Sequence, residues 1–255
     1  MKPYCYLFAL VAAPSVFGFG TLIQTFESGE DTSDWGNSFW DAPAGFTATT
    51  PSFLDSSIGG AQAGYGSTSD GQDARRVYKF NTANLDYTSE YTISLYIVLS
   101  SDSIPSSGEF SVINGNYGGE SFGDLRVVSD GDNLDWEARD DSVFQDVGID
   151  LAADTPYFIQ FTIKPETATY DVYVAEVDTF GVVQESGSLT DLSIASYVIT
   201  NDNYSTLRVH ANASAGTLDF AADNINIANV PEPRAFAALA GCVALAAVWR
   251  RRQQS

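Results

Sequence analysis

The chain has few cysteines, few histidines and few basic residues, and each shortage excludes a class of protein. Its 255 residues include two cysteines, Cys5 and Cys242, which lie in the apolar stretches at the two ends. The region between those stretches therefore has no disulfide, and its stability must come from a hydrophobic core. The single histidine, His210, has neither a cysteine nor a nucleophile-elbow serine to accompany it. It supports neither a zinc site nor a catalytic triad, and we expect a structural or surface role for it.

Basic residues are scarcest between positions 21 and 229. All 33 Asp and Glu residues except Glu232 lie in this range, together with seven of the 12 Lys and Arg residues, which gives a net charge of −25. This charge argues against a nucleic-acid partner, because phosphate binding requires basic patches. Solubility and resistance to self-association account for most of the acidic surface, and binding of divalent cations is a second use for part of it.

Residues 21–229 also lack a sustained 3.6-residue periodicity, and short runs of alternating apolar and polar residues take its place. In residues 91–99, Tyr91, Ile93, Leu95, Ile97 and Leu99 occupy one face, and Thr92, Ser94, Tyr96 and Val98 occupy the other. Similar runs are found at residues 21–27, 75–81, 110–113, 125–129, 134–138, 157–164, 170–177, 207–210 and 224–230.

Turn-forming residues separate these runs, and we predict turns at residues 114–116, 129–133 and 164–167. The many short strands predict an all-β fold, a single antiparallel β-sandwich of the jelly-roll type. Residues 31–71 are rich in Gly, Ser, Thr, Ala and Asp, which predicts long surface loops with one or two short strands. No repeat or Pro/Ser-rich linker interrupts the sequence before Val230, so residues 21–229 are predicted to form one domain.

The N-terminal residues 1–20 are typical of a secretory signal peptide. Lys2 provides a positive start, residues 4–16 are apolar, and the small residues Gly18 and Gly20 offer a cleavage site. We expect a signal helix that is removed after one of these glycines. A buried first strand or helix is the alternative interpretation.

The C-terminal end contains a second apolar segment. Residues 235–249 carry no charge and are followed at once by Arg250, Arg251 and Arg252. A stable transmembrane helix needs about 20 apolar residues, so this helix is expected to span a membrane marginally or transiently. The three arginines would stay on the cytoplasmic side, which places the body of the chain outside.

The motif Pro231-Glu232-Pro233, the Ala/Leu-rich segment 235–249 and the arginine triplet together resemble the PEP-CTERM sorting signal of Gram-negative bacteria. The resemblance covers residues 230–255. It implies recognition by a membrane-embedded exosortase, cleavage near the Pro-Glu-Pro motif, and delivery to the cell surface or extracellular matrix. The sorting helix would be the only contact with a membrane.

A second resemblance concerns the middle of the chain. Residues 155–164, a turn at 165–167 and residues 168–174 resemble the central hairpin of concanavalin A-like lectin/glucanase and laminin G-like sandwiches. Residues 26–29 and 223–227 resemble the first and last strands of such jelly rolls, which pair with each other. The resemblance implies a fold more than a function.

Laminarinase-type glycoside hydrolases of this fold carry alternate carboxylates on one strand face, in a Glu-x-Asp-x-(x)-Glu pattern. Asp135 and Glu137 would share such a face, but the first and last Glu of the pattern are missing here. Arg139 falls on the same face and would keep these carboxylates ionised. We therefore expect a solvated, salt-bridged strand face, no catalytic residues and no enzymatic activity.

Calcium is the one ion that the sequence suggests, as a structural ligand and not as a cofactor. Asp130, Asp132, Asn133 and Asp135 cluster in one turn, although an ordinary hairpin turn explains the same residues. The second candidate pair is Glu27 with Asp223, because related jelly-roll carbohydrate-binding modules hold calcium where the first and last strands meet.

Carbohydrate binding requires exposed aromatic platforms, and Trp35, Trp40, Tyr65 and Tyr117 lie in loop-like, Gly-rich stretches that could supply them. A sandwich core also uses many aromatic residues, so platform and core remain alternatives. The leading hypothesis is a non-catalytic exported surface or matrix protein that binds extracellular polysaccharide. The alternative is a polysaccharide-active hydrolase or lyase of the same fold.

Overall fold

The structure is a computed structural model. It describes residues 22–28, 35–36, 47–49, 54, 58–68, 72–79, 85–100, 109–116, 121–130, 133–194, 205–213 and 218–230. The described strands all belong to one compact unit, residues 20–229. The predicted signal peptide, Pro-Glu-Pro motif, apolar helix and arginine triplet lie outside the described residues. Within the described ranges, no helix is long and apolar enough to cross a membrane.

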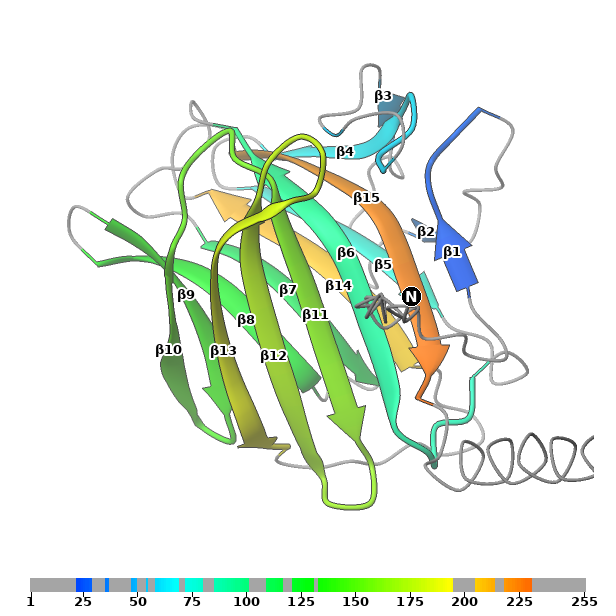
Figure 1. The fold of residues 1–255 in the computed structure, drawn as a ribbon, viewed down its shortest axis with the longest axis vertical. Helices are drawn as coiled ribbons and strands as arrows, with labels where there is room; N and C mark the ends of the chain where they lie inside the picture. The colour runs from blue at the N-terminus through cyan, green and yellow to red at the C-terminus, as the bar shows by residue number, and fades with distance from the viewer. Residues whose placement is uncertain are drawn as a thin grey trace, which may run out of the picture. The chain divides into compact units, whose positions relative to one another are not determined.

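The chain forms two stacked antiparallel sheets (Figure 1). The front sheet, which faces the viewer in Figure 1, has the strand order β13-β12-β11-β6-β15-β4-β3, and β1 also pairs with β15. The back sheet has the order β10-β9-β8-β7-β14-β5-β2. Front-sheet strands are β1 (Leu22–Gln24), β3 (Thr47–Thr49), β4 (Ala63–Thr68), β6 (Tyr91–Leu99), β11 (Tyr157–Lys164), β12 (Thr169–Val177), β13 (Val183–Ser193) and β15 (Leu218–Asn229). Back-sheet strands are β2 (Trp35–Gly36), β5 (Gln72–Lys79), β7 (Glu109–Asn116), β8 (Ser121–Asp130), β9 (Asn133–Asp140), β10 (Val143–Asp150) and β14 (Ser205–Ala213).

Alternation along the strands creates the core between the sheets. In β6 and β11 every second residue is buried, which confirms the predicted inward face of residues 91–99. Trp136 of β9 is fully buried, with its ring centroid 5.6 Å from that of Tyr157 and 6.3 Å from that of Phe110. Burial of such apolar surface is the main stabilising contribution in a domain without a disulfide.

The predicted turn at residues 114–116 is wrong, because these residues belong to β7. The Asn114 side chain is buried, where it accepts a hydrogen bond from the Tyr91 hydroxyl (3.0 Å) and donates one to the Thr206 carbonyl (2.9 Å). These tertiary partners satisfy an amide that would otherwise favour a turn. The turns predicted at residues 129–133 and 164–167 do separate strands.

The first and last strands pair with each other, but the first strand is β1 and not residues 26–29 as the resemblance implies, because residues 26–28 belong to no strand. Leu22, Ile23 and Gln24 lie opposite Ile227, Asn226 and Ile225. The register between β15 and β6 shifts between Asp223 and Asn226, and Asn224 has a φ of 49° there. This bulge adds one residue to β15 and separates the part that pairs with β4 from the part that pairs with β1.

Strands β10 and β13 were missed at the sequence level, and β2, β3 and β4 all lie in residues 31–71, where one or two strands were predicted without bounds. Strand β13 is an edge strand whose residues are mostly exposed on both faces, so it has no apolar alternation. Strand β10 is the other sheet's edge, and its register shifts near Gly148, which has a φ of 84°. Strand β4 is short and Gly-rich. Residues 31–71 thus hold three described strands, not one or two.

Candidate functional site

Three aromatic side chains form a row across the outer face of the front sheet. They are Tyr96 of β6, Phe158 of β11 and Tyr173 of β12. The ring centroids of Tyr96 and Phe158 are 5.2 Å apart, and those of Phe158 and Tyr173 are 6.3 Å apart. Each occupies the outward position between core residues and is half-buried. The rings therefore form a continuous apolar strip on the surface, which we call the aromatic row.

Polar side chains surround the aromatic row. Ser94, Gln160 and Thr162 occupy neighbouring outward positions on β6 and β11. Partial burial raises the pKa of the Tyr96 phenol, so its hydroxyl stays protonated at neutral pH and can both donate and accept a hydrogen bond. An apolar strip with hydrogen-bonding neighbours suits a ligand that has apolar faces and polar edges.

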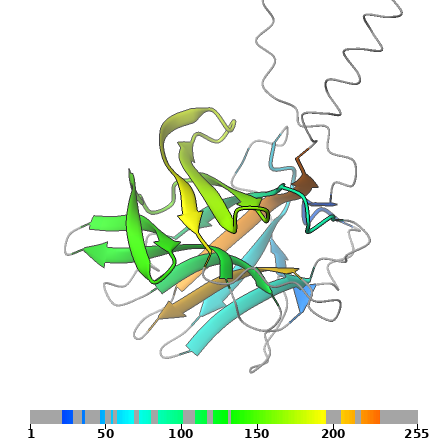
Figure 2. The same ribbon diagram turned by 90° about the horizontal axis from the view of Figure 1, so that it is seen from below.

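The loop between β12 and β13 closes one end of the row. Asp178 Oδ1 accepts hydrogen bonds from the backbone N–H groups of Phe180 and Val182, both at 2.9 Å. Gly181, with a φ of 77°, lies beside the Tyr96 hydroxyl and the Ile58 side chain. The Phe180 side chain is 62% exposed. In Figure 2 this loop stands out from the strands on the side of the front sheet.

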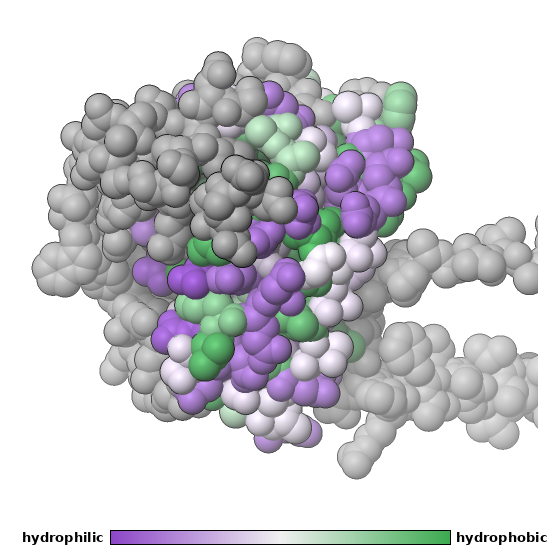
Figure 3. Space-filling model, turned by 90° about the vertical axis from the view of Figure 1, so that its left-hand side faces the viewer, coloured by the Kyte–Doolittle hydropathy of each residue, from purple (hydrophilic) through white to green (hydrophobic). Residues whose placement is uncertain are grey.

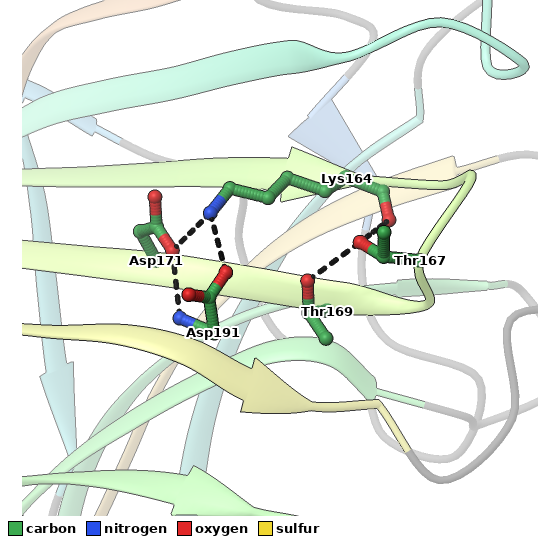
Figure 4. A network of polar contacts seen from close by, with 5 residues as sticks. All are labelled: Lys164, Thr167, Thr169, Asp171 and Asp191. Atoms are coloured by element: carbon green, nitrogen blue, oxygen red, sulfur yellow. Dashed lines mark hydrogen bonds and ion pairs between the residues drawn. The ribbon is translucent and has the colours of Figure 1, made fainter.

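The opposite end of β11 and β12 carries a charged network (Figure 4). Lys164 Nζ lies 2.7 Å from Asp171 Oδ1 and 2.8 Å from Asp191 Oδ1, and the Asp191 N–H donates to Asp171 Oδ1. Burial would lower the pKa of Lys164, but the two carboxylates outweigh it and the pKa is raised. Next to the network, at the β11–β12 turn, the hydroxyls of Thr167 and Thr169 lie 2.8 Å apart. The network fixes the register of β11, β12 and β13.

The two members of the predicted calcium pair, Glu27 and Asp223, have different surroundings. Glu27 Oε1 accepts hydrogen bonds from the N–H groups of Ala61 (2.5 Å) and Gln62 (3.0 Å). Asp223 is fully buried, and the next residue, Asn224, donates from Nδ2 to the Ile58 carbonyl. Glu27 and Asn224, the neighbour of Asp223 in sequence, therefore both form hydrogen bonds with segment 58–62. Calcium at this place stays a prediction.

The acidic turn lies between β8 and β9, where Asp130 pairs with Asn133. Asp132 and the side chain of Asp130 lie outside the described residues, and Asp135 is half-buried in β9. No group of three or more His, Cys, Asp or Glu side chains able to hold a metal ion occurs among the residues that the structure describes.

Asp135, Glu137 and Arg139 share the outer face of β9, as predicted. Glu137 is paired with Arg126 of β8, with Arg126 Nη2 2.8 Å from Glu137 Oε2, whereas Arg139 lies 3.5 Å from Asp124. The Arg126 guanidinium also stacks 3.5 Å above the Phe144 ring centroid. The basic partner of Glu137 thus comes from the neighbouring strand, because cross-strand residues are closer than residues two apart on one strand.

The predicted platform residues are only partly described. Trp35 lies in β2 opposite Tyr78, but its side chain is outside the described part of the chain. Trp40 and Tyr117 are outside the described residues altogether. Tyr65 is half-buried in β4 and points to the outer face of the front sheet, the face of the aromatic row. His210 lies in β14, where Nδ1 is 3.4 Å from the buried Ser111 hydroxyl.

The aromatic row itself was missed by sequence reasoning. Its members lie in predicted strands, at the outward positions of alternating runs, where an aromatic residue is unusual. That signal was present at Tyr96, Phe158 and Tyr173, but the strands must be paired in register before the three rings can be recognised as neighbours.

The fold defines the chain as a two-sheet antiparallel β-sandwich. No family model and no curated protein matches the sequence. Among solved structures, the chain is similar to a carbohydrate esterase from the Shiga toxin-encoding bacteriophage phi24B, with 13% identity, a TM-score of 0.55, and coverage of 84% of this chain and 99% of that one. At this identity the likeness concerns the fold.

Two further solved structures are similar at lower TM-scores. One is the CBM2 module of an evolved Dit protein from Lactobacillus casei BL23 phage J-1, with 13% identity and a TM-score of 0.44 over 76% of this chain and 94% of that one. The other is an alginate lyase, with 10% identity and a TM-score of 0.43 over 67% of this chain and 76% of that one.

Proposed function

We propose that this protein is a non-catalytic exported surface or matrix protein that binds extracellular polysaccharide through the outer face of its front sheet. The observation that carries the proposal is the aromatic row, because sugar rings stack their apolar faces on aromatic side chains while their hydroxyls reach polar neighbours. The row crosses three adjacent strands, which holds the rings rigidly and lowers the entropic cost of binding.

The non-catalytic part of the proposal rests on the carboxylates of β9. Glu137 is paired with Arg126 of β8, so its carboxylate is already engaged in a salt bridge. A glycosidase acid must instead be free to donate a proton to the leaving group. The finer fold assignment, a concanavalin A-like jelly roll, is supported by the β11–β12 hairpin in the front sheet and by the pairing of β1 with β15.

Export is proposed from the sequence of the two ends. The signal-like residues 1–20 would direct secretion, and the segment from Val230 to the arginine triplet would be recognised and cleaved by an exosortase. The product would be released to the cell surface or extracellular matrix of a Gram-negative bacterium. A polysaccharide-binding domain has its ligand in that compartment.

The proposal is tested by glycan-array binding of residues 21–229 and of the double variant Phe158→Ala/Tyr173→Ala. Loss of two stacking rings is expected to weaken binding by about 1–3 kcal/mol, which is roughly five- to 150-fold. Phe144→Ala is the matched control, because Phe144 is an outward aromatic residue on the back sheet. The same samples are assayed for release of reducing sugar ends.

Three results would contradict the proposal. The first is that the unchanged domain binds no glycan on the array. The second is that the double variant keeps its affinity while Phe144→Ala loses binding. The third is hydrolysis or cleavage of a bound polysaccharide. The last result would favour the enzymatic alternative, and loss of that activity in Asp135→Asn or Glu137→Gln would then identify the active face.

A further inference from the structure

We infer that the β12–β13 loop extends the aromatic row as a preformed wall of the binding site, and that the polysaccharide bound there is neutral and not anionic. This inference rests on the proposed function and adds a contact residue, Phe180, and a ligand class. The juxtaposition that carries it is an exposed apolar loop beside Tyr96 on a face with almost no basic residues.

The loop presents its apolar side chains in a fixed geometry. Asp178 Oδ1 accepts from two N–H groups of the loop, the Gly181 N–H donates to the Asp178 carbonyl (2.8 Å), and the Asp178 N–H donates to the Val182 carbonyl (3.0 Å). The side chains of Phe180, Val182 and Val183 are 62%, 57% and 49% exposed. Exposing three large apolar side chains on a hydrogen-bonded loop costs free energy that ligand contact would offset.

The loop is continuous with the aromatic row. A Cβ atom built on Gly181 would lie 3.6 Å from the Tyr96 hydroxyl and 2.6 Å from Ile58 Cδ1. The Gly181 backbone therefore lies beside the Tyr96 hydroxyl at the end of the row, and its tighter approach to Ile58 requires a residue without a side chain. Phe180 directly precedes Gly181 in this loop, and its side chain is exposed to solvent.

Charge selects the ligand class. Lys164 is the one basic residue in the strands of the front sheet, and it is already paired with Asp171 and Asp191. The same strands carry six acidic residues, Asp171, Glu176, Glu185, Asp191, Asp219 and Asp223. An anionic polymer would be repelled there.

The experiment measures binding of residues 21–229 to neutral probes (laminarin, xylan and cellohexaose) and anionic probes (alginate and polygalacturonate), at low and high salt with a chelator present. We expect binding to a neutral probe that changes little with salt. Phe180→Ala should weaken it about five- to tenfold, whereas Val143→Ala should not, because Val143 is a similarly exposed residue on the β9–β10 hairpin.

Two variants of Asp178 test whether the loop geometry matters. Asp178→Ala removes the acceptor of the two N–H groups and should weaken binding, whereas Asp178→Asn keeps an acceptor oxygen without the charge and should bind almost normally. Equal loss in both variants would overturn the preformed wall. Unchanged binding in Phe180→Ala would overturn the contact between Phe180 and the polysaccharide. Tighter binding of an anionic probe at low salt would overturn the neutral ligand class. Neither result would affect the aromatic row, which is tested by its own variants. No binding of any probe by the unchanged domain would defeat the proposed function itself.

Discussion

At the scale of the residue, Tyr170 joins the two sheets through one hydroxyl. Its O–H contacts the carbonyl oxygens of Asp124 (3.2 Å) and Arg139, both in the back sheet, while the ring packs against Phe161 in the front sheet. Tyr170→Phe should lower the free energy of unfolding by about 1–2 kcal/mol, because buried acceptors lose their donor. Urea denaturation measures this. Tyr173→Phe, on the outer face, is the control, and equal stability of both variants would contradict the assignment.

The Tyr170 hydroxyl also makes the free energy of unfolding depend on pH in the alkaline range. Burial raises the pKa of Tyr170 above the value of about 10 that applies to an unfolded chain. The stabilising contribution is therefore complete below about pH 10 and falls as pH rises further, because the unfolded chain releases the proton first. The unfolding free energy of the unchanged domain should decline more steeply above this pH than that of Tyr170→Phe. Parallel curves would show that the hydroxyl is not buried as described.

At the scale of the element, β10 and β13 close one edge of the sandwich. The Asp141 N–H donates to the Ser193 carbonyl (3.0 Å), and the Ser193 N–H donates to Asp140 Oδ1 (2.8 Å), which lowers the pKa of Asp140. A Cβ atom on Gly187 would lie 2.2 Å from the Val147 carbonyl oxygen. Figure 3 shows this edge of the molecule, where hydrophilic residues predominate and hydrophobic ones form small separate patches.

Gly187→Ala should separate β13 from β10, because the Val147 carbonyl belongs to the backbone and cannot rotate away. We expect a loss of about 1–3 kcal/mol of stability and faster hydrogen exchange at the amides of β10 and β13 than elsewhere. Ser186→Ala, at the adjacent exposed position, should change neither quantity. Uniform acceleration of exchange across both sheets would instead indicate global destabilisation and contradict a local closure.

At the scale of the whole molecule, the prediction concerns the C-terminal tail. Pro231 and Pro233 lack backbone donors and are expected to favour an extended Glu232, so the motif should stay accessible to a processing enzyme. The arginine triplet should resist translocation and keep the chain end inside. In its native host, the mature protein is expected to end near the Pro-Glu-Pro motif and to be recovered from the surface or matrix. Mass spectrometry that finds residues 250–255 on the extracellular protein would contradict this.

The sequence by itself determined the fold class and most of the strands. Alternation is a local property, so the inward faces of β6, β11 and β12 could be recognised without coordinates. It also determined which acidic and basic residues share the face of β9, because side chains two apart on a strand point the same way. The edge strands could not be predicted, because exposure on both faces removes the alternation.

Only the tertiary structure decided where a ligand could bind. Tyr96, Phe158 and Tyr173 lie far apart in the sequence, and the pairing of β6, β11 and β12 brings their rings together. The same long-range pairing turned Asn114 from a turn residue into a buried one, and placed Arg126 beside Glu137. Register is set by packing across the whole sheet, and no single segment of sequence contains that information.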